Sequence, residues 1–222
     1  MTRIVDDIAP RRVLATRNRS WARVTAAWLA AHGVQPNVVS LASVVCAASA
    51  AVAFVGSALL ASPSHRASLL VAAGVFVQLR LLCNMLDGML AVEGGLGTKT
   101  GDIYNELPDR LADVLILVGA GYAVRDLAYG ATLGWTAAVL ALLTAYIRAL
   151  SGSLGLPQHF LGPMAKQHRM FAVTLAALAA AAETYIGWPA RALAGGLAII
   201  ICGSVITAWR RTTRLAQEAN AR

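Results

Sequence analysis

The stretch NMLDGMLAVEGGLGTKTGDIYNELPDRLAD, residues 84–113, lies between two long apolar runs and holds six of the eleven acidic residues of the chain. The six are Asp87, Glu93, Asp102, Glu106, Asp109 and Asp113. Carboxylates at the edge of a lipid bilayer are costly to bury, so they usually mark a functional site. We therefore expect the chemistry of the protein to lie in this stretch.

The composition of the chain is typical of a membrane protein. Of its 222 residues, 58% are hydrophobic and 14% are charged, whereas a soluble domain is about half apolar and about a quarter charged. The apolar residues come in long runs, which favours membrane-spanning helices. We expect an all-α integral membrane protein with six transmembrane helices. Residues 20–32 are predicted either as an amphipathic helix on the membrane surface or as the cytosolic start of the first span.

The six predicted spans cover residues 38–61, 67–91, 102–124, 127–150, 169–186 and 189–209. The first carries no charged residue and, at 1.5 Å per residue, would be about 36 Å long, enough to cross a bilayer. The predicted organisation is a cytoplasmic tail and amphipathic helix over residues 1–32, a six-helix transmembrane catalytic domain over 33–209, and a basic cytoplasmic tail over 210–222.

Lysine and arginine are unevenly distributed over the predicted loops. The N-terminal tail, the 93–101 loop, the 151–169 loop and the C-terminal tail hold 6, 1, 2 and 4 of them, and the opposite loops hold three. This bias predicts that both termini of a multi-pass membrane protein are cytoplasmic. The net charge of +8 then suits anionic lipid, which argues against nucleic acid as a partner.

The spacing of the polar residues places them on facing sides of two neighbouring helices. Asn84 and Asp87 are three residues apart, and Asn105, Asp109 and Asp113 follow one another at intervals of four. Residues at these intervals share one face of a helix. Carboxylate and amide oxygens are the ligands that Mg²⁺ prefers, so the pair of helices predicts a divalent-metal site.

Two other interpretations of the acidic stretch are weighed. One is a polar bundle core neutralised by Arg80 and Arg110, although the acids outnumber these two arginines. The other is a small membrane transporter for an ion or solute. A transporter more often places its acids at the middle of the bilayer on broken helices, whereas here they lie at one edge beside a loop.

The same stretch resembles the signature of the CDP-alcohol phosphotransferases (CDP-alcohol phosphatidyltransferases), D-x2-D-G-x2-A-R-x8-G-x3-D-x3-D. In this chain the signature positions are Asn84, Asp87, Gly88, Ala91, Val92, Gly101, Asn105 and Asp109. Every spacing is kept and five of the eight residues match. Similarity to the family extends to Pro36-Asn37, Tyr146-Ile147-Arg148 and the segment from Gly162 to Arg169.

Three positions depart from the signature. Asn84 and Asn105 stand where the family has its first and third Asp, and Val92 stands where it has Arg. Asparagine still offers a carbonyl oxygen but no charge. Either fewer metal ions bind than in the family, or Glu106 and Asp113 support the metal instead. The chain resembles a divergent bacterial branch of the family, which implies a location in the cytoplasmic (inner) membrane of a bacterium. A non-catalytic nucleotide- or lipid-binding relative is the alternative.

The resemblance implies transfer of a phosphatidyl-type group from a CDP-alcohol, with CDP-diacylglycerol the expected donor, to an acceptor hydroxyl in phospholipid biosynthesis, with release of CMP. It implies a divalent metal cofactor, Mg²⁺ or Mn²⁺, and a role for Asp109 as the general base. The implied metal ligands are Asn84, Asp87, Asn105 and Asp109. The residues expected to let the CDP group pack closely are Gly88, Ala91 and Gly101.

A second basic set, Arg148, Lys166 and Arg169, is predicted at the same membrane face. One interpretation is a pocket for a polar alcohol acceptor, phosphorylated or not. The other is the ordinary positive charge of cytoplasmic loops. Arg148 falls inside a predicted span, which favours the pocket. The resemblance is also consistent with a homodimer embedded in membrane lipid.

Overall fold

The computed structural model describes residues 19–92, 94–96, 100–124, 127–188 and 190–221, without the side chain of Asp102. The described residues form helices and no strand. In chain order the elements are α1 (Ser20–Ala31), α2 (Pro36–Leu59), α3 (Pro63–Val92), α4 (Gly101–Ala123), α5 (Gly130–Ser153), α6 (Lys166–Glu183), the short 3₁₀ helix η2 (Thr184–Ile186) and α7 (Arg191–Asn220). The all-α fold class predicted from the sequence is confirmed.

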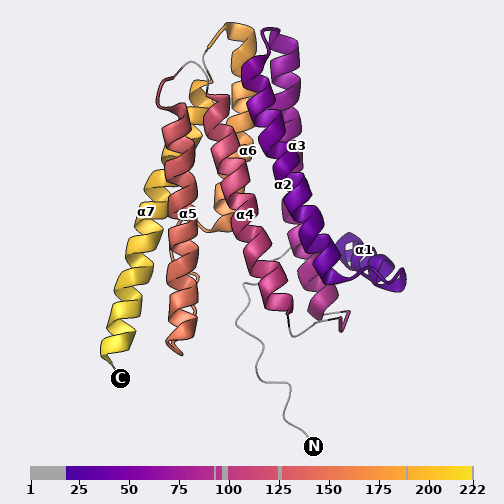
Figure 1. Cartoon of the computed structure of the whole chain (residues 1–222), viewed down its shortest axis with the longest axis vertical. Helices are drawn as coiled ribbons and strands as arrows, with labels where there is room; N and C mark the ends of the chain where they lie inside the picture. The colour runs from indigo at the N-terminus through magenta and orange to yellow at the C-terminus, as the bar shows by residue number, and fades with distance from the viewer. Residues whose placement is uncertain (1–18, 93, 97–99, 125–126, 189, 222) are drawn as a thin grey trace, which may run out of the picture.

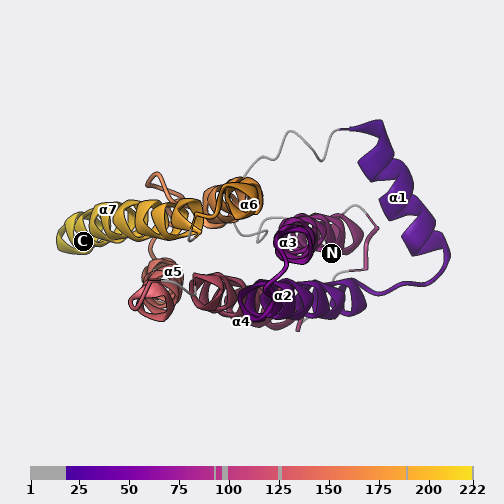
Figure 2. The ribbon, with the colours of Figure 1, turned by 90° about the horizontal axis from the view of Figure 1, so that it is seen from above.

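The long helices α2 to α7 run along one axis and form a ring (Figures 1 and 2). Each packs on two neighbours, in the order α3, α2, α4, α5, α7, α6 and back to α3. Helices α3 and α4 are consecutive in the sequence but are not close neighbours in this ring, because α2 packs between them. Side chains from α3 and α4 therefore meet across the interior of the bundle.

Five helices, α2, α3, α5, α6 with η2, and α7, are long and apolar enough to cross a membrane. Helix α4 is long enough, with 23 residues, but its first half is rich in charged residues. It nevertheless packs between α2 and α5 as part of the ring. The sixth crossing therefore remains a prediction, which the position of α4 supports. Helix α7 continues to Asn220, so the described part of the predicted basic tail is largely helical.

Helix α1 is a separate element and not the first turns of the first span. It lies beside the bundle near the C-terminal end of α3, crosswise to the long helices, and packs on α3 (Figures 1 and 2). Ala22 and Ala26 are buried on its inner side, while Trp21 and Trp28 are about half exposed. Exposed aromatic residues on one side suit the surface helix predicted here. The tail before residue 19 lies outside the described residues.

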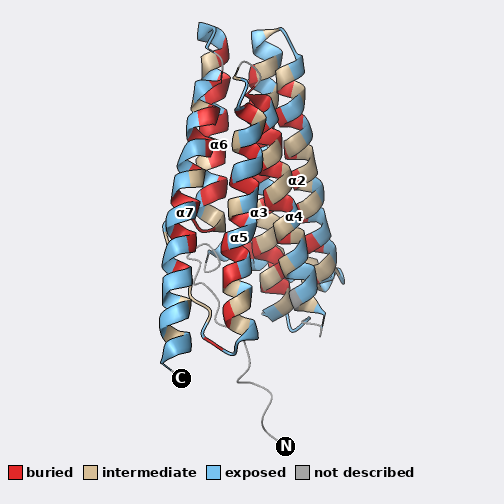
Figure 3. Cartoon of the chain, turned by 60° about the vertical axis from the view of Figure 1, so that its left-hand side comes forward, coloured by how far each residue is buried: buried red, intermediate tan, exposed pale blue. Residues whose placement is uncertain are grey.

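Small residues let the helices of the ring approach closely. A Cβ atom added to Gly121 of α4 would lie 2.6 Å from the Cα atom of Gly134 in α5. Such contacts between small residues are common between membrane helices, where tight packing replaces the hydrophobic effect. Figure 3 shows the result, with buried residues along the inner faces and exposed residues along the outer faces. This close packing holds the helices that carry the polar residues.

Candidate active site

The predicted site residues gather in the interior of one end of the ring. They come from the last turns of α3, the first half of α4, the C-terminal part of α5 and the start of α6. The same end carries α1 and the C-terminal turns of α7 (Figure 1). The α3–α4 connection is described only in part, and the predicted acids Glu93 and Asp102 have no described side chain.

Asp109 lies at the centre of this cluster and is 5% exposed. Its Oδ1 atom accepts hydrogen bonds from Asn84 Nδ2 at 2.8 Å and from Arg80 at 3.1 Å. Its Oδ2 atom accepts one from Lys166 Nζ at 2.5 Å. Asn84 Nδ2 also points to Asn105 Oδ1 at 3.5 Å. Signature positions from α3 and α4 thus meet as the spacing predicts.

Asp87 is the second carboxylate of the signature and is 3% exposed. Its Oδ2 atom accepts a hydrogen bond of 2.6 Å from Ser40 Oγ of α2. Its Oδ1 atom is buried and has no hydrogen-bond partner among the described residues. Ser40 was not predicted, and the sequence holds no signal for it, because it lies 47 residues away within an apolar run.

The sequence analysis offered Glu106 and Asp113 as possible support for the metal. In the structure both acids pair with arginines. Asp113 is fully buried; its Oδ1 accepts from Arg80 at 3.2 Å and its Oδ2 from Arg169 at 2.7 Å. Glu106 binds Arg110 at 2.8 Å and Arg148 at 2.6 Å. Guanidinium groups thus neutralise both carboxylates.

The basic residues predicted as an acceptor pocket do not lie together on a free surface. Arg169 is 2% exposed and, besides Asp113, donates to the Met164 carbonyl at 2.9 Å. Lys166 lies inside the cluster around Asp109. Arg148 is half-buried, with its guanidinium 5.6 Å from the centre of the Phe160 ring. Each basic residue is therefore matched to a different acid of α4, and the acid paired with Arg148, Glu106, is the most exposed of the three.

The donor set suits a hard divalent cation. Asn84 of α3 lies within hydrogen-bonding distance of Asn105 and Asp109 of α4, and Asp87 is near enough for its charge to interact with those of Asp109 and Lys166. The Oδ1 atom of Asp87 is buried and has no hydrogen-bond partner among the described residues. Mg²⁺ and Mn²⁺ prefer such oxygens. Within the described residues, no three His, Cys, Asp or Glu side chains form a metal-binding group, since two of the four predicted ligands are Asn.

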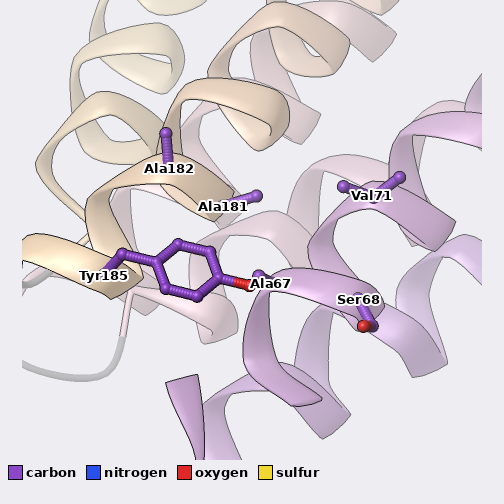
Figure 4. Close-up of a pocket in the computed structure, with 6 residues that line it drawn as sticks. All are labelled: Ala67, Ser68, Val71, Ala181, Ala182 and Tyr185. Carbon is purple, nitrogen blue, oxygen red and sulfur yellow. The ribbon is translucent and has the colours of Figure 1, made fainter. Parts of the chain in front are cut away.

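The predicted CDP-contacting residues lie at the same end of the bundle. Gly88 and Ala91 belong to the last turns of α3, and Gly101 begins α4. All three are half-buried. A separate shallow pocket lies between α3 and α6 at the other end, lined by Ala67, Ser68, Val71, Ala181, Ala182 and Tyr185 (Figure 4). Val71 and Asp87 are about 24 Å apart along α3 at 1.5 Å per residue, so this pocket is remote from the cluster.

The family model for CDP-alcohol phosphatidyltransferases matches residues 34–209 of the chain. The chain belongs to the CDP-alcohol phosphatidyltransferase family. Solved structures of phosphatidylinositol phosphate synthase (PgsA1) from Mycobacterium tuberculosis share its fold. The form with CDP-DAG bound is 24% identical, with a TM-score of 0.72, over 87% of this chain and 92% of that one. The form with manganese and citrate is 23% identical, with a TM-score of 0.73, over 87% and 88%. A comparison with curated proteins finds no match.

Family membership fixes the class of reaction. These enzymes transfer a phosphatidyl-type group from a CDP-alcohol to an acceptor hydroxyl in phospholipid synthesis, and they depend on a divalent metal. The chain is thus a multi-pass membrane transferase. The prediction of the family from the signature spacing is confirmed, in spite of the Asn residues at 84 and 105.

Proposed function

We propose that the chain transfers the phosphatidyl group of CDP-diacylglycerol to the hydroxyl of a polar alcohol, with release of CMP, at the cluster around Asp87 and Asp109. The observation that carries this proposal is that the signature residues of α3 and α4 meet in one cluster, in which the carboxylates of Asp87 and Asp109 are buried and the Asn105 side chain is exposed. A site at the end of a membrane bundle can meet both a lipid donor and a soluble acceptor.

In this proposal Asn84, Asp87, Asn105 and Asp109 hold the metal. A bound divalent ion supplies Lewis-acid stabilisation of the diphosphate and of the charge on departing CMP. Gly88, Ala91 and Gly101 offer little side-chain bulk, so the CDP group can approach the ends of α3 and α4. The protein contributes chiefly by positioning and by placing charge, which dominate phosphoryl-type transfer.

Asp109 accepts the proton of the acceptor hydroxyl in this mechanism. Each carboxylate oxygen offers about two lone pairs, and Asp109 Oδ2 has one described hydrogen bond, from Lys166. A second lone pair on Oδ2 therefore remains for the proton, and a metal ion at Asp109 would replace one of the two hydrogen bonds to Oδ1. Asn84 and Arg80 hold the opposite oxygen and fix the orientation of the carboxylate.

The acceptor is proposed to bind beside Arg148, which makes a phosphorylated alcohol the favoured class. Arg148 pairs with Glu106, the most exposed of the three acids that the basic residues contact, and its planar guanidinium suits a phosphate. Lys166 and Arg169 are engaged with Asp109 and Asp113, so their contribution to the acceptor is indirect in the structure as it stands.

The orientation proposed is that of the sequence analysis, with both termini, α1 and the site on the cytoplasmic side of a bacterial inner membrane. Support comes from α1 and the end of α7, which lie at the same end as the cluster (Figure 1). Trp21 and Trp28 of α1 would then face the lipid interface, where aromatic residues are enriched.

The decisive experiment measures CMP release from CDP-diacylglycerol by the purified chain in detergent micelles, with Mg²⁺ or Mn²⁺ and a panel of alcohols and phosphorylated alcohols. We expect metal-dependent release that requires one class of acceptor. No release with any acceptor would contradict the proposal. The non-catalytic alternative is tested by the Asn84→Asp, Asn105→Asp double variant, because activity confined to that variant would support it.

A further inference from the structure

Lys166 occupies an unexpected place among the oxygens of the site. Its Nζ atom donates to Asn84 Oδ1 and, at 2.5 Å, to Asp109 Oδ2. Its side chain is 23% exposed. An ammonium group is a point charge of +1 that only donates hydrogen bonds. The position between these two oxygens is therefore suited to a cation, and the chain itself supplies one.

The number of carboxylates in the site determines how much cationic charge it can hold, so the ammonium of Lys166 affects metal binding. The family signature carries four Asp residues, whereas this chain keeps only Asp87 and Asp109 and has Asn at the other two positions. Glu106 and Asp113 do not restore the missing charge, because arginines pair with both. Two carboxylates bind fewer divalent ions than four. The ammonium group also reduces the negative charge that a metal ion would balance.

We propose that Lys166 serves as a built-in cation of the active site, in the place that a second divalent ion would take, so that the chain binds one divalent ion. That ion binds on the side of Asp87, where Oδ1 is buried and without a partner among the described residues. Lys166 reaches Asp109 Oδ2 from the start of α6 and offsets the charge of that carboxylate. This inference rests on the proposed function of the same cluster.

Asn84 does more than lower the charge of the site, because its amide makes hydrogen bonds with both Lys166 and Asp109. An Asp at 84 would form a second carboxylate against the ammonium, whereas Asn presents its carbonyl oxygen to Lys166 and its Nδ2 to Asp109. The amide therefore fits between a cation and a carboxylate, satisfying both with one side chain. Asn84 and Lys166 both donate to Asp109, so together they place one positive charge beside that carboxylate.

The test counts Mn²⁺ ions bound to the purified full chain in detergent by equilibrium dialysis, without nucleotide or acceptor. We expect one ion for each wild-type chain. The variant Lys166→Met should bind Mn²⁺ about tenfold more tightly, because it removes a unit positive charge from beside a metal ligand. The triple variant Asn84→Asp, Asn105→Asp, Lys166→Met should bind a second ion. Arg210→Met, which removes an exposed cation of α7, is the matched control and should leave Mn²⁺ affinity unchanged.

Two ions on the wild-type chain would overturn the proposal, as would an unchanged Mn²⁺ affinity in Lys166→Met. Should that variant elute as an aggregate, the wild-type count and the conservative variant Lys166→Gln decide the question. The outcomes also separate this inference from the proposed function. If the wild-type chain binds two ions and releases CMP normally, the proposed role of Lys166 is wrong and the proposed reaction stands. If it binds one ion but shows no metal-dependent CMP release, the proposed reaction is wrong and the ion count still agrees with the role of Lys166.

Discussion

The two halves of α4 are held in place by different forces. In the first half, Glu106, Asp109 and Asp113 pair with cations from α3, α4, α5 and α6. In the second half, Gly119 lies close to Ala51 of α2, and Gly121 close to Gly134 of α5. One half depends on compensation of charge and the other on complementary shape, within a single helix.

The comparison explains how a charged helix can belong to a membrane bundle. Burying an ion is costly unless it is paired and hydrogen-bonded. The buried acids of α4 meet this condition through cations on other helices, while the apolar half anchors α4 between its neighbours. The polar half is therefore available for chemistry at the end of the bundle, without support from a separate domain.

The largest expected effect is loss of turnover in Asp109→Asn. The change removes the proposed base and half of the charge of the metal site, so CMP release should fall at least about 10³-fold. Steady-state CMP release in micelles measures it, and thermal unfolding of the same sample verifies the fold. Substantial activity in a folded variant would remove Asp109 as the base.

Asp113→Asn probes the structural acid in the same half of α4. It leaves the buried Arg169 without its carboxylate and should lower the free energy of unfolding by about 3–5 kcal/mol. Unfolding in mixed micelles with increasing denaturing detergent measures the loss. The double variant Asp113→Asn, Arg169→Met should recover part of it, because the unpaired charge is gone. No recovery would mean that the ion pair is not the cause.

Gly121→Ala tests the half of α4 that depends on shape. The added methyl group would meet Gly134, so we expect a loss of about 1–3 kcal/mol from overpacking, with little change in the KM of the folded enzyme. Gly195→Ala in α7 is the matched control, since a Cβ atom there has nothing within 4 Å. Equal stability of the two variants would contradict the close α4–α5 contact.

The smallest effect is expected at the periphery of the charged half. Arg148→Ala should raise the KM for a phosphorylated acceptor about tenfold, roughly 1.4 kcal/mol, and that for CDP-diacylglycerol much less. Initial rates with each substrate varied in turn give both constants, with the exposed Arg210→Ala as control. Equal changes in the two constants would argue against an acceptor site at Arg148.

Several features of the fold and site were predictable because they are local in the sequence. Long apolar runs give membrane helices, and the spacing of Asn84 and Asp87 on one helix and of Asn105 and Asp109 on the next gives two polar faces. Contacts between distant segments were not predictable in this way. Ser40 is the example, because nothing in an apolar run shows which of its hydroxyls will meet Asp87.

The sequence by itself determined the membrane class, the family and the two carboxylates expected to do the chemistry, because periodicity and fixed spacing are properties of the chain alone. Only the tertiary structure decided which cation serves which acid. Lys166 and Arg169 are three residues apart and resemble one basic motif, yet they pair with Asp109 and Asp113 respectively. This pairing depends on how α6 packs against α3 and α7, because the position of α6 along the bundle axis determines which carboxylate each of its side chains reaches.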